Sequence, residues 1–160
     1  MIRIGQGFDI HRLVPGRPLM LGGIRIPSEA GLLGHSDADV LLHAVTDALL
    51  GALGLGDLGQ WFPDTDPRYR NIASSILLET VLCAPQAQGW TLVNLDTTIL
   101  AERPRLAPHI PAIRNSVAAL FKAETGQVSV KAATMEGLDS IGRGEAIGVQ
   151  AVLLLSRDTA

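Results

Sequence analysis

One carboxylate and two imidazoles are spaced so that they can hold a metal ion. Asp9 and His11 lie two positions apart in residues 2–11, a stretch with the pattern of a β-strand. Side chains alternate between the two faces of a strand, so Asp9 and His11 point to the same side. With His43 they offer three protein ligands, which leaves the fourth position of a tetrahedral zinc open, as in catalytic zinc sites. The spacing therefore predicts a catalytic metal centre.

His43 lies within an apolar helical pattern, Val40–Val45, where a histidine has no evident packing purpose. A histidine there is also typical of a satisfied core or interface residue, and short motifs often match by chance. Asp39 and Asp47 lie one helical turn on either side, and either can orient the second ring nitrogen of His43. Solvated helix faces explain both aspartates about equally well.

The segment Ser36–Asp39 has the form of a capping box and predicts a helix over residues 37–53, capped by Ser36. Free amide groups and the helix dipole favour an anion at a helix start. Helical side chains lean toward the N-terminus, so a metal held by His43 is expected near that anion.

The loop from Gly56 to Pro67 carries Asp57, Asp64 and Asp66 among glycines, prolines and two aromatic residues. Carboxylates on a stiffened loop suit hydrogen bonding to the hydroxyls of a polyol. Aspartate beside proline is also ordinary turn chemistry, so the loop favours this function only slightly.

The elements that must position these residues alternate between strands and helices. We expect strands at residues 2–11, 19–26, 90–100, 127–134 and 147–155, and helices at residues 37–53, 71–88 and 108–124. The order β-β-α-α-β-α-β-β predicts an α/β fold with a single mixed β-sheet and helices packed on one face. We expect one domain over residues 1–160.

The amino-acid composition limits the kinds of partner that we expect the chain to bind. Hydrophobic residues make up 47% and charged residues 18%, so some apolar surface is expected to meet another copy of the chain. The net charge of −3 gives no electrostatic case for nucleic acid or an anionic membrane. No apolar stretch is long enough to span a bilayer. Cys83, the only cysteine, lies in an apolar pattern that predicts burial, and its isolation fits a reducing cytoplasm.

Taken in order, the motifs of the chain resemble one family, the 2-C-methyl-D-erythritol 2,4-cyclodiphosphate synthases of the non-mevalonate isoprenoid pathway. The resemblance covers nearly the whole chain, without an attached cytidylyltransferase domain. The matching motifs are Gly7–His11, Gly22–Pro27, His35–Asp39, His43–Gly51, Gly56–Gly59, Phe62–Pro67, Pro108–Pro111 and Gly142–Glu145.

The resemblance implies a homotrimeric phosphorus-oxygen lyase with active sites between subunits. Its substrate is 4-diphosphocytidyl-2-C-methyl-D-erythritol 2-phosphate, whose 2-phosphate attacks the β-phosphorus, closes the cyclic diphosphate and expels CMP. Asp9, His11 and His43 are then the zinc ligands. Glu136 holds a second ion, Mg²⁺ or Mn²⁺, and His35 and Thr134 stabilise the transition state.

The resemblance also assigns the substrate contacts. It places Asp57, Gly59 and the loop from Phe62 to Asp66 in the methylerythritol pocket. It places residues 101–107 with Ala133 and Thr134 in the cytidine pocket of the neighbouring subunit. The whole set is Asp9, His11, His35, Ser36, Asp57, Gly59, Phe62, Asp64, Asp66, Ala101, Pro104, Arg105, Leu106, Ala107, Ala133, Thr134, Glu136 and Arg143. Phe8 and Arg143 match positions lining a central cavity of the trimer, which in some members holds an isoprenoid diphosphate.

The chain departs from the family pattern at a few positions. Ala133 stands where a threonine is usual, which removes a hydroxyl near the nucleotide. Asp139-Ser140 replaces Gly-Phe and Ala146 replaces a glycine. Ser140 removes an aromatic side chain from the cavity and weakens the case for an isoprenoid there.

Two other functions use the same residues. Two histidines and a carboxylate also form the facial triad of non-haem iron oxygenases, which normally lies in a β-rich barrel. The third possibility is a non-catalytic trimeric module that binds a nucleotide or an isoprenoid diphosphate around a structural metal.

Overall fold

The computed structural model describes residues 1–158 as one mixed sheet covered by helices. Five strands pair in the order β4-β1-β7-β5-β6, and β2 and β3 form a separate hairpin. β5 and β6 are parallel, whereas the other pairs are antiparallel. The strands are β1 (Ile2–Pro15), β2 (Leu19–Leu21), β3 (Ile24–Ile26), β4 (Ala30–Leu32), β5 (Thr91–Leu100), β6 (Val128–Ala133) and β7 (Ala146–Ser156).

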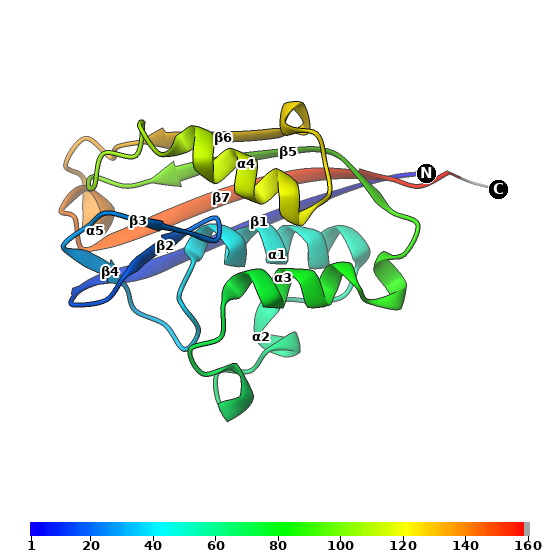
Figure 1. Cartoon of the computed structure of the whole chain (residues 1–160), viewed down its shortest axis with the longest axis horizontal. Coiled ribbons are helices and arrows are strands. Elements are labelled where there is room, and N and C mark those ends of the chain that lie inside the picture. Colours follow the sequence, from blue (N-terminus) through cyan, green and yellow to red (C-terminus); the bar gives the residue numbers. More distant parts are fainter. Residues whose placement is uncertain (159–160) are drawn as a thin grey trace.

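The helices α1 and α4 pack on one face of this sheet and α3 packs against α1 (Figure 1), which confirms the predicted fold class. The helices are α1 (Val40–Leu53), α2 (Leu58–Trp61), α3 (Ser74–Leu82), α4 (Ile110–Leu120) and α5 (Asp139–Gly142). Within the described residues, no helix combines the length and the apolar character needed to cross a membrane.

Two glycines let α1 lie directly on the backbone of β1. A Cβ built on Gly5 would lie 1.8 Å from the carbonyl oxygen of Ala48, and one on Gly7 would lie 2.0 Å from that of Ala44. No side chain fits at either position without moving the helix. This contact fixes the distance between His43 on α1 and the face of β1 that carries Asp9 and His11.

We expect Gly7→Ala to lower the free energy of unfolding by roughly 3 kcal/mol, because the added methyl group overpacks a backbone contact. The displaced α1 should also carry His43 away from β1 and weaken metal binding. Urea denaturation and a zinc competition assay measure the two effects. Gly126→Ala is the matched control, since its Cβ would meet nothing within 4 Å. Equal stability of the two variants would show that α1 shifts to accommodate the added methyl group at no cost, contrary to this prediction.

The start of α1 differs from the prediction. Asp39, not Ser36, is the N-cap: its Oδ1 accepts from the amides of Leu42 and Gly22, both at 3.0 Å, and its Oδ2 accepts from Gly23 at 2.6 Å. The helix therefore begins at Val40 rather than at residue 37. Asp39 occupies one amide of the first turn of α1, that of Leu42, and the anion at this helix start stays a prediction.

Other boundaries shifted for local reasons. β1 continues to Pro15, and the expected strand at residues 19–26 is a hairpin, because Gly22 and Gly23 both have positive φ, 65° and 80°. Pro85 ends the predicted helix at residues 71–88 early, in a 3₁₀ turn after α3. The expected helix at residues 108–124 is only α4, and short elements occupy expected loops at β4, α2 and α5.

The sheet face opposite the helices is open and carries large apolar side chains. The even-numbered positions of β1 point to this face, since the odd ones, Gly5 and Gly7, face α1. Its exposed apolar residues are Ile2 (68%), Ile4 (69%), Phe8 (51%), Ile10 (43%) and, on the paired strand β7, Val152 (39%). We call these five residues the open apolar face.

Candidate metal centre

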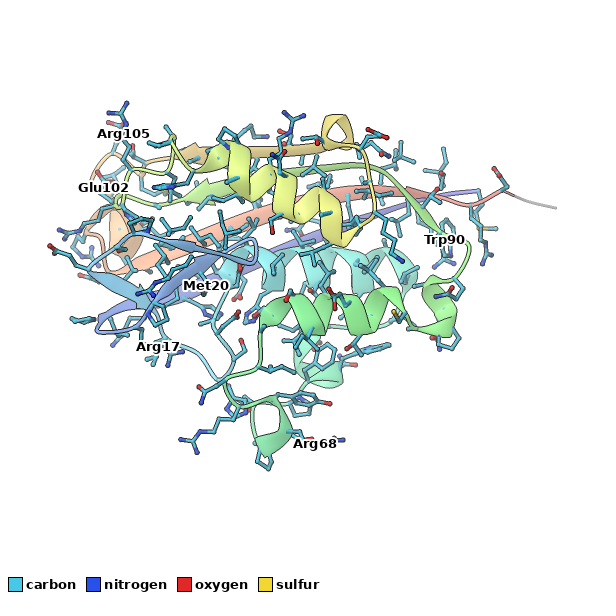
Figure 2. The ribbon with its side chains drawn as sticks, viewed as in Figure 1. Arg17, Met20, Arg68, Trp90, Glu102 and Arg105 are labelled. Carbon is cyan, nitrogen blue, oxygen red and sulfur yellow. The ribbon has the colours of Figure 1, made fainter. Side chains whose placement is uncertain are left out.

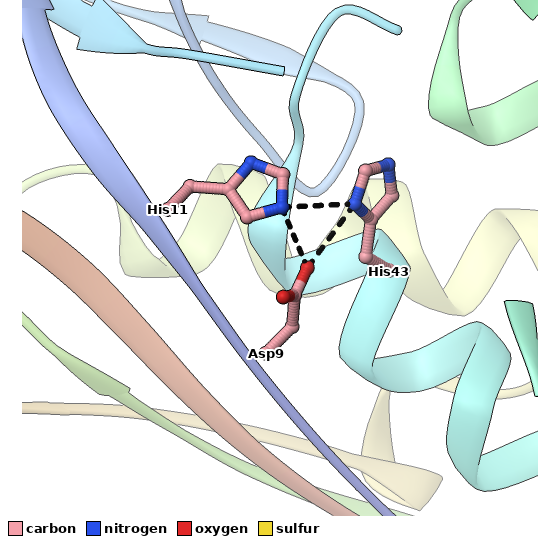
Figure 3. A group of neighbouring side chains, drawn as sticks. All are labelled: Asp9, His11 and His43. Carbon is pink, nitrogen blue, oxygen red and sulfur yellow. Dashed lines mark hydrogen bonds and ion pairs between the residues drawn. The ribbon is translucent and has the colours of Figure 1, made fainter. Parts of the chain in front are cut away.

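The structure brings Asp9, His11 and His43 together (Figure 3). Asp9 Oδ2 lies 2.8 Å from His11 Nε2 and 3.1 Å from His43 Nδ1, and the two nitrogens lie 3.3 Å apart. The first two side chains project from the same face of β1, as their spacing predicted, and the third projects from α1. One donor atom from each residue thus faces the other two.

The size of this triangle fits a tetrahedral ion. Metal–ligand bonds of about 2.0–2.1 Å at tetrahedral angles place neighbouring ligand atoms about 3.3 Å apart. The three observed separations, 2.8–3.3 Å, are close to that value. Two imidazole nitrogens and one carboxylate oxygen form a donor set that suits zinc and other borderline divalent metals. The residues present therefore fit a metal ion with three protein ligands.

Asp9 is kept as an anion in this cluster. Its partial burial acts to raise the pKa of the carboxyl group, but hydrogen bonds and charge interactions with His11 and His43 outweigh burial and hold the pKa well below its usual range. A carboxylate that stays ionised is a ready ligand for a cation.

The second nitrogen of His43 has partners that we did not predict. His43 Nε2 lies 2.9 Å from Ser74 Oγ and 3.0 Å from Ser36 Oγ. Neither aspartate proposed for this role contacts His43 through its side chain: Asp39 caps α1, and Asp47 Oδ1 accepts from the amide of Leu58 at 2.7 Å. Both alternatives for the supporting aspartate were wrong.

A cavity of about 590 Å³ opens beside the cluster of Asp9, His11 and His43. It is lined by His11 and His43 and by five further predicted substrate residues, His35, Ser36, Gly59, Phe62 and Asp64. Asp57 and Asp66 are close by but serve local structure, as N-caps of α2 and of the following 3₁₀ turn. The carbonyl oxygen of Asp66 also accepts from His35 Nε2 at 3.0 Å, which orients the His35 ring.

The remaining predicted site residues lie elsewhere in the chain. Figure 2 shows Glu102 and Arg105 far from Arg68, which follows the cavity loop. Thr134 Oγ1 donates to Glu136 Oε1 at 3.1 Å, so the proposed second metal ligand is beside Thr134 and not in the triad. This separate group comprises Ala101, Pro104, Arg105, Leu106, Ala107, Ala133, Thr134 and Glu136.

The two predicted cavity residues of the trimer are both exposed. Phe8 belongs to the open apolar face, and Arg143 pairs with Glu145 through its Nε at 2.8 Å. Burial of Cys83 was also predicted, and this prediction is wrong. Cys83 is exposed at the end of α3, where the apolar face of the helix no longer determines the direction of its side chain.

The fold is a single mixed sheet with helices on one face, and it carries a cavity beside three convergent side chains that fit a metal ion; these features define an α/β protein with a candidate metal site. Comparison with known proteins narrows this class. The YgbB family model matches residues 2–156, and the chain belongs to the YgbB family.

Named relatives match over nearly the whole chain. A 2-C-methyl-D-erythritol 2,4-cyclodiphosphate synthase of Geobacillus kaustophilus is 58% identical over 157 residues, covering 98% of this chain and 99% of the relative. A solved 2C-methyl-D-erythritol-2,4-cyclodiphosphate synthase in a CDP-bound form has a TM-score of 0.88 at 42% identity, covering 96% of this chain and all of that one.

A second solved structure, the bifunctional IspDF from Campylobacter jejuni, has a TM-score of 0.93 at 39% identity. The match covers 99% of this chain but only 43% of that protein, so the similarity concerns one part of the bifunctional chain.

Proposed function

We propose that this protein is a phosphorus-oxygen lyase of the non-mevalonate isoprenoid pathway. It converts 4-diphosphocytidyl-2-C-methyl-D-erythritol 2-phosphate into 2-C-methyl-D-erythritol 2,4-cyclodiphosphate and CMP. The observation that carries this proposal is the full-length match to synthases of that name, by a chain that retains the convergent Asp9–His11–His43 cluster. We further propose that residues 1–160 act as one domain and that the enzyme works in the cytoplasm.

The reaction brings two anionic phosphates together, so catalysis depends on charge neutralisation and positioning rather than on a side-chain nucleophile. We propose that Asp9, His11 and His43 hold Zn²⁺ and that Glu136 holds Mg²⁺ or Mn²⁺. When bound, these ions supply Lewis-acid stabilisation of phosphoryl oxygens. Asp9 contributes a fixed negative charge that favours the cation, and His11 and His43 contribute neutral nitrogen donors.

Residues of the cavity bind and orient the substrate in this proposal. His35, held by the carbonyl of Asp66, and the Ser36 hydroxyl are directed to phosphate oxygens. The methylerythritol hydroxyls form hydrogen bonds with Asp57, Gly59, Asp64 and Asp66. Apolar side chains in the cavity wall, Phe62 and Leu77 among them, reduce access of water, which would otherwise hydrolyse the diphosphate.

We propose that a neighbouring subunit completes each site in a homotrimer. Residues 101–107, Ala133, Thr134 and Glu136 lie outside the cavity of their own chain, which is what a cytidine pocket shared between subunits requires. The open apolar face supports self-association, because large apolar side chains gathered on one face are unfavourable in water. Phe8 and Arg143 then lie toward the centre of the trimer.

Turnover of the proposed substrate is the direct test. The purified protein is incubated with the diphosphocytidyl substrate, Zn²⁺ and Mg²⁺, and the products are followed by ³¹P NMR and chromatography. We expect equal amounts of CMP and cyclic diphosphate without O₂. A metal-loaded trimer that releases no CMP would contradict the proposal and favour a non-catalytic module. Turnover that requires iron and O₂ would favour an oxygenase, which the named relatives do not support.

A further inference from the structure

We propose that Ser74 and Asp37 form a hydrogen-bonded pair that determines which ring nitrogen of His43 faces the metal. Both are positioning residues: they act on the ligand and do not touch the ion or the substrate. The inference deepens the proposed function, since it concerns the same metal centre. Its basis is a chain of contacts from His43 Nε2 to Ser74 Oγ, at 2.9 Å, and from Ser74 Oγ to Asp37 Oδ1.

The proton count fixes the direction of each hydrogen bond. Asp37 Oδ1 accepts the backbone amide of Asp39 at 3.2 Å, so it is an acceptor for Ser74 as well. A serine hydroxyl has a single proton, and Ser74 donates it to Asp37. Ser74 Oγ can then meet His43 Nε2 only as an acceptor, and therefore Nε2 carries hydrogen.

A neutral imidazole has one N–H group, so hydrogen on Nε2 leaves a lone pair on Nδ1. His43 Nδ1 is the atom that lies 3.1 Å from Asp9 Oδ2 and 3.3 Å from His11 Nε2. The pair formed by Ser74 and Asp37 thus directs the only free lone pair of His43 into the metal cluster. The opposite tautomer would point a proton at the cation.

Ser36 reinforces the same assignment. Its Oγ accepts the amide of Ala38 at 3.1 Å and lies 3.2 Å from Ser74 Oγ and 3.0 Å from His43 Nε2. The proton of Ser36 goes to Ser74 in the free protein and to a phosphate oxygen when substrate is bound, so in both states the two hydroxyls present acceptor lone pairs to the His43 N–H. Because Ser36 also lines the cavity, it is a poor choice for a test variant.

Burial leaves His43 no other hydrogen-bond partner at Nε2. Ser74 is fully buried and His43 is 8% exposed, so solvent does not replace a lost partner at Nε2. His11 differs: its buried Nδ1 has no hydrogen-bond partner among the described residues. The chain therefore sets the tautomer of His43 and leaves that of His11 to the metal itself.

A purely structural role for Ser74 is the competing explanation. Ser74 begins α3 and Asp37 precedes α1, so the pair also joins two elements that pack together. The side chain of Asp37 does not cap α3, whose N-cap, Ala73, makes no side-chain hydrogen bond. A test must therefore separate metal affinity from folding.

The test compares Ser74→Ala, Asp37→Ala and Asp37→Asn with wild type and with Ser75→Ala, the adjacent half-buried serine. Zinc affinity is measured without substrate by chelator competition, and thermal unfolding of the metal-free proteins is followed by circular dichroism. Ser74→Ala and Asp37→Ala should weaken zinc binding about 10- to 100-fold, the range for loss of a residue that orients a metal ligand. Asp37→Asn keeps an acceptor for the Ser74 hydroxyl and should stay within about threefold of wild type.

The tautomer itself is read in wild type. Two-dimensional ¹⁵N NMR of the zinc-loaded protein should show His43 with hydrogen on Nε2, and Asp37→Asn should keep that signature. Wild-type zinc affinity in Ser74→Ala, equal losses in both Asp37 variants, or hydrogen on Nδ1 of His43 would each overturn the inference. None of these measurements uses turnover, so they stand or fall independently of whether the protein releases CMP.

Discussion

His43→Ala is expected to lose at least about a thousandfold in turnover while the protein keeps its fold and assembly. The substitution removes one of three convergent donors and leaves Asp9 and His11 as a two-ligand remnant with far weaker metal affinity. Loss of a major electrostatic contribution to a phosphoryl-transfer transition state costs about 4 kcal/mol, which corresponds to that factor. CMP release and zinc content, by plasma mass spectrometry, measure the two effects.

The control for this variant is His109→Ala, the same chemical change at the N-cap of α4 and outside the cavity. It should retain turnover and zinc. Removal of the metal from wild type with a chelator should reproduce the His43→Ala phenotype, and added Zn²⁺ should restore only the wild type. If His43→Ala lost assembly and activity together, the metal would have a structural role. If it kept its turnover, the triad would not be the active site.

Ile4→Asp is expected to convert the proposed trimer into folded monomers that bind zinc but turn over at least about a hundredfold more slowly. Ile4 is 69% exposed in the single chain, so the substitution leaves the core intact and changes little in the monomer. In the proposed trimer we expect the same position to be buried against apolar neighbours, where an unpaired carboxylate costs several kcal/mol in each subunit. Activity should fall because the cavity residues of one subunit then no longer meet the separate group, which contains Glu136, of its neighbour.

Sedimentation velocity, zinc competition and CMP release test this variant at one protein concentration. Ile76→Asp is the matched control, because Ile76 is also exposed, at 48%, but lies on α3 and not on the open apolar face. It should remain trimeric and active. A trimeric Ile4→Asp, or a wild type that sediments as a monomer at full activity, would contradict the assembly that we propose.

Much of the candidate metal centre could be predicted because its residues stand out in short, local sequence patterns. Asp9 and His11 share a face through the two-residue period of a strand, and His43 stands out as a polar residue in an apolar helix. The meeting of strand and helix depends on Gly5 and Gly7. Both glycines are visible in the sequence, but their role is evident only once α1 is known to lie across them.

The contacts that sequence analysis missed are long-range. Ser74 reaches His43 across 31 positions, and the predicted helix at residues 71–88 placed Ser74 about one turn inside the helix rather than at its first position. Asp39 was one of two candidates to orient His43, because the two are neighbours on a helix. Its side chain instead caps α1 and accepts from Gly22 and Gly23 of a distant hairpin. Local patterns hold no information about such partners.

The separation of the site residues into two groups was expected only from the resemblance, which places residues 101–107 in the pocket of a neighbouring subunit. The resemblance assigns Asp64 and Arg105 to one active site, yet only Asp64 lines the cavity within a single chain. In the proposed trimer, the way the second group meets a neighbour depends on the shape of a whole sheet face, which no window of sequence describes.

The main chains of α1 and β1 are in direct contact, and this contact affects which amino-acid substitutions the protein tolerates. The separation of the metal ligands is set where two main chains touch, with no side chain in between. Substitutions among the leucines and valines around that contact can therefore accumulate and shift the melting temperature while the ligand triangle keeps its dimensions. In a lineage adapting to heat or cold, thermal stability and metal coordination can thus be tuned as separate traits.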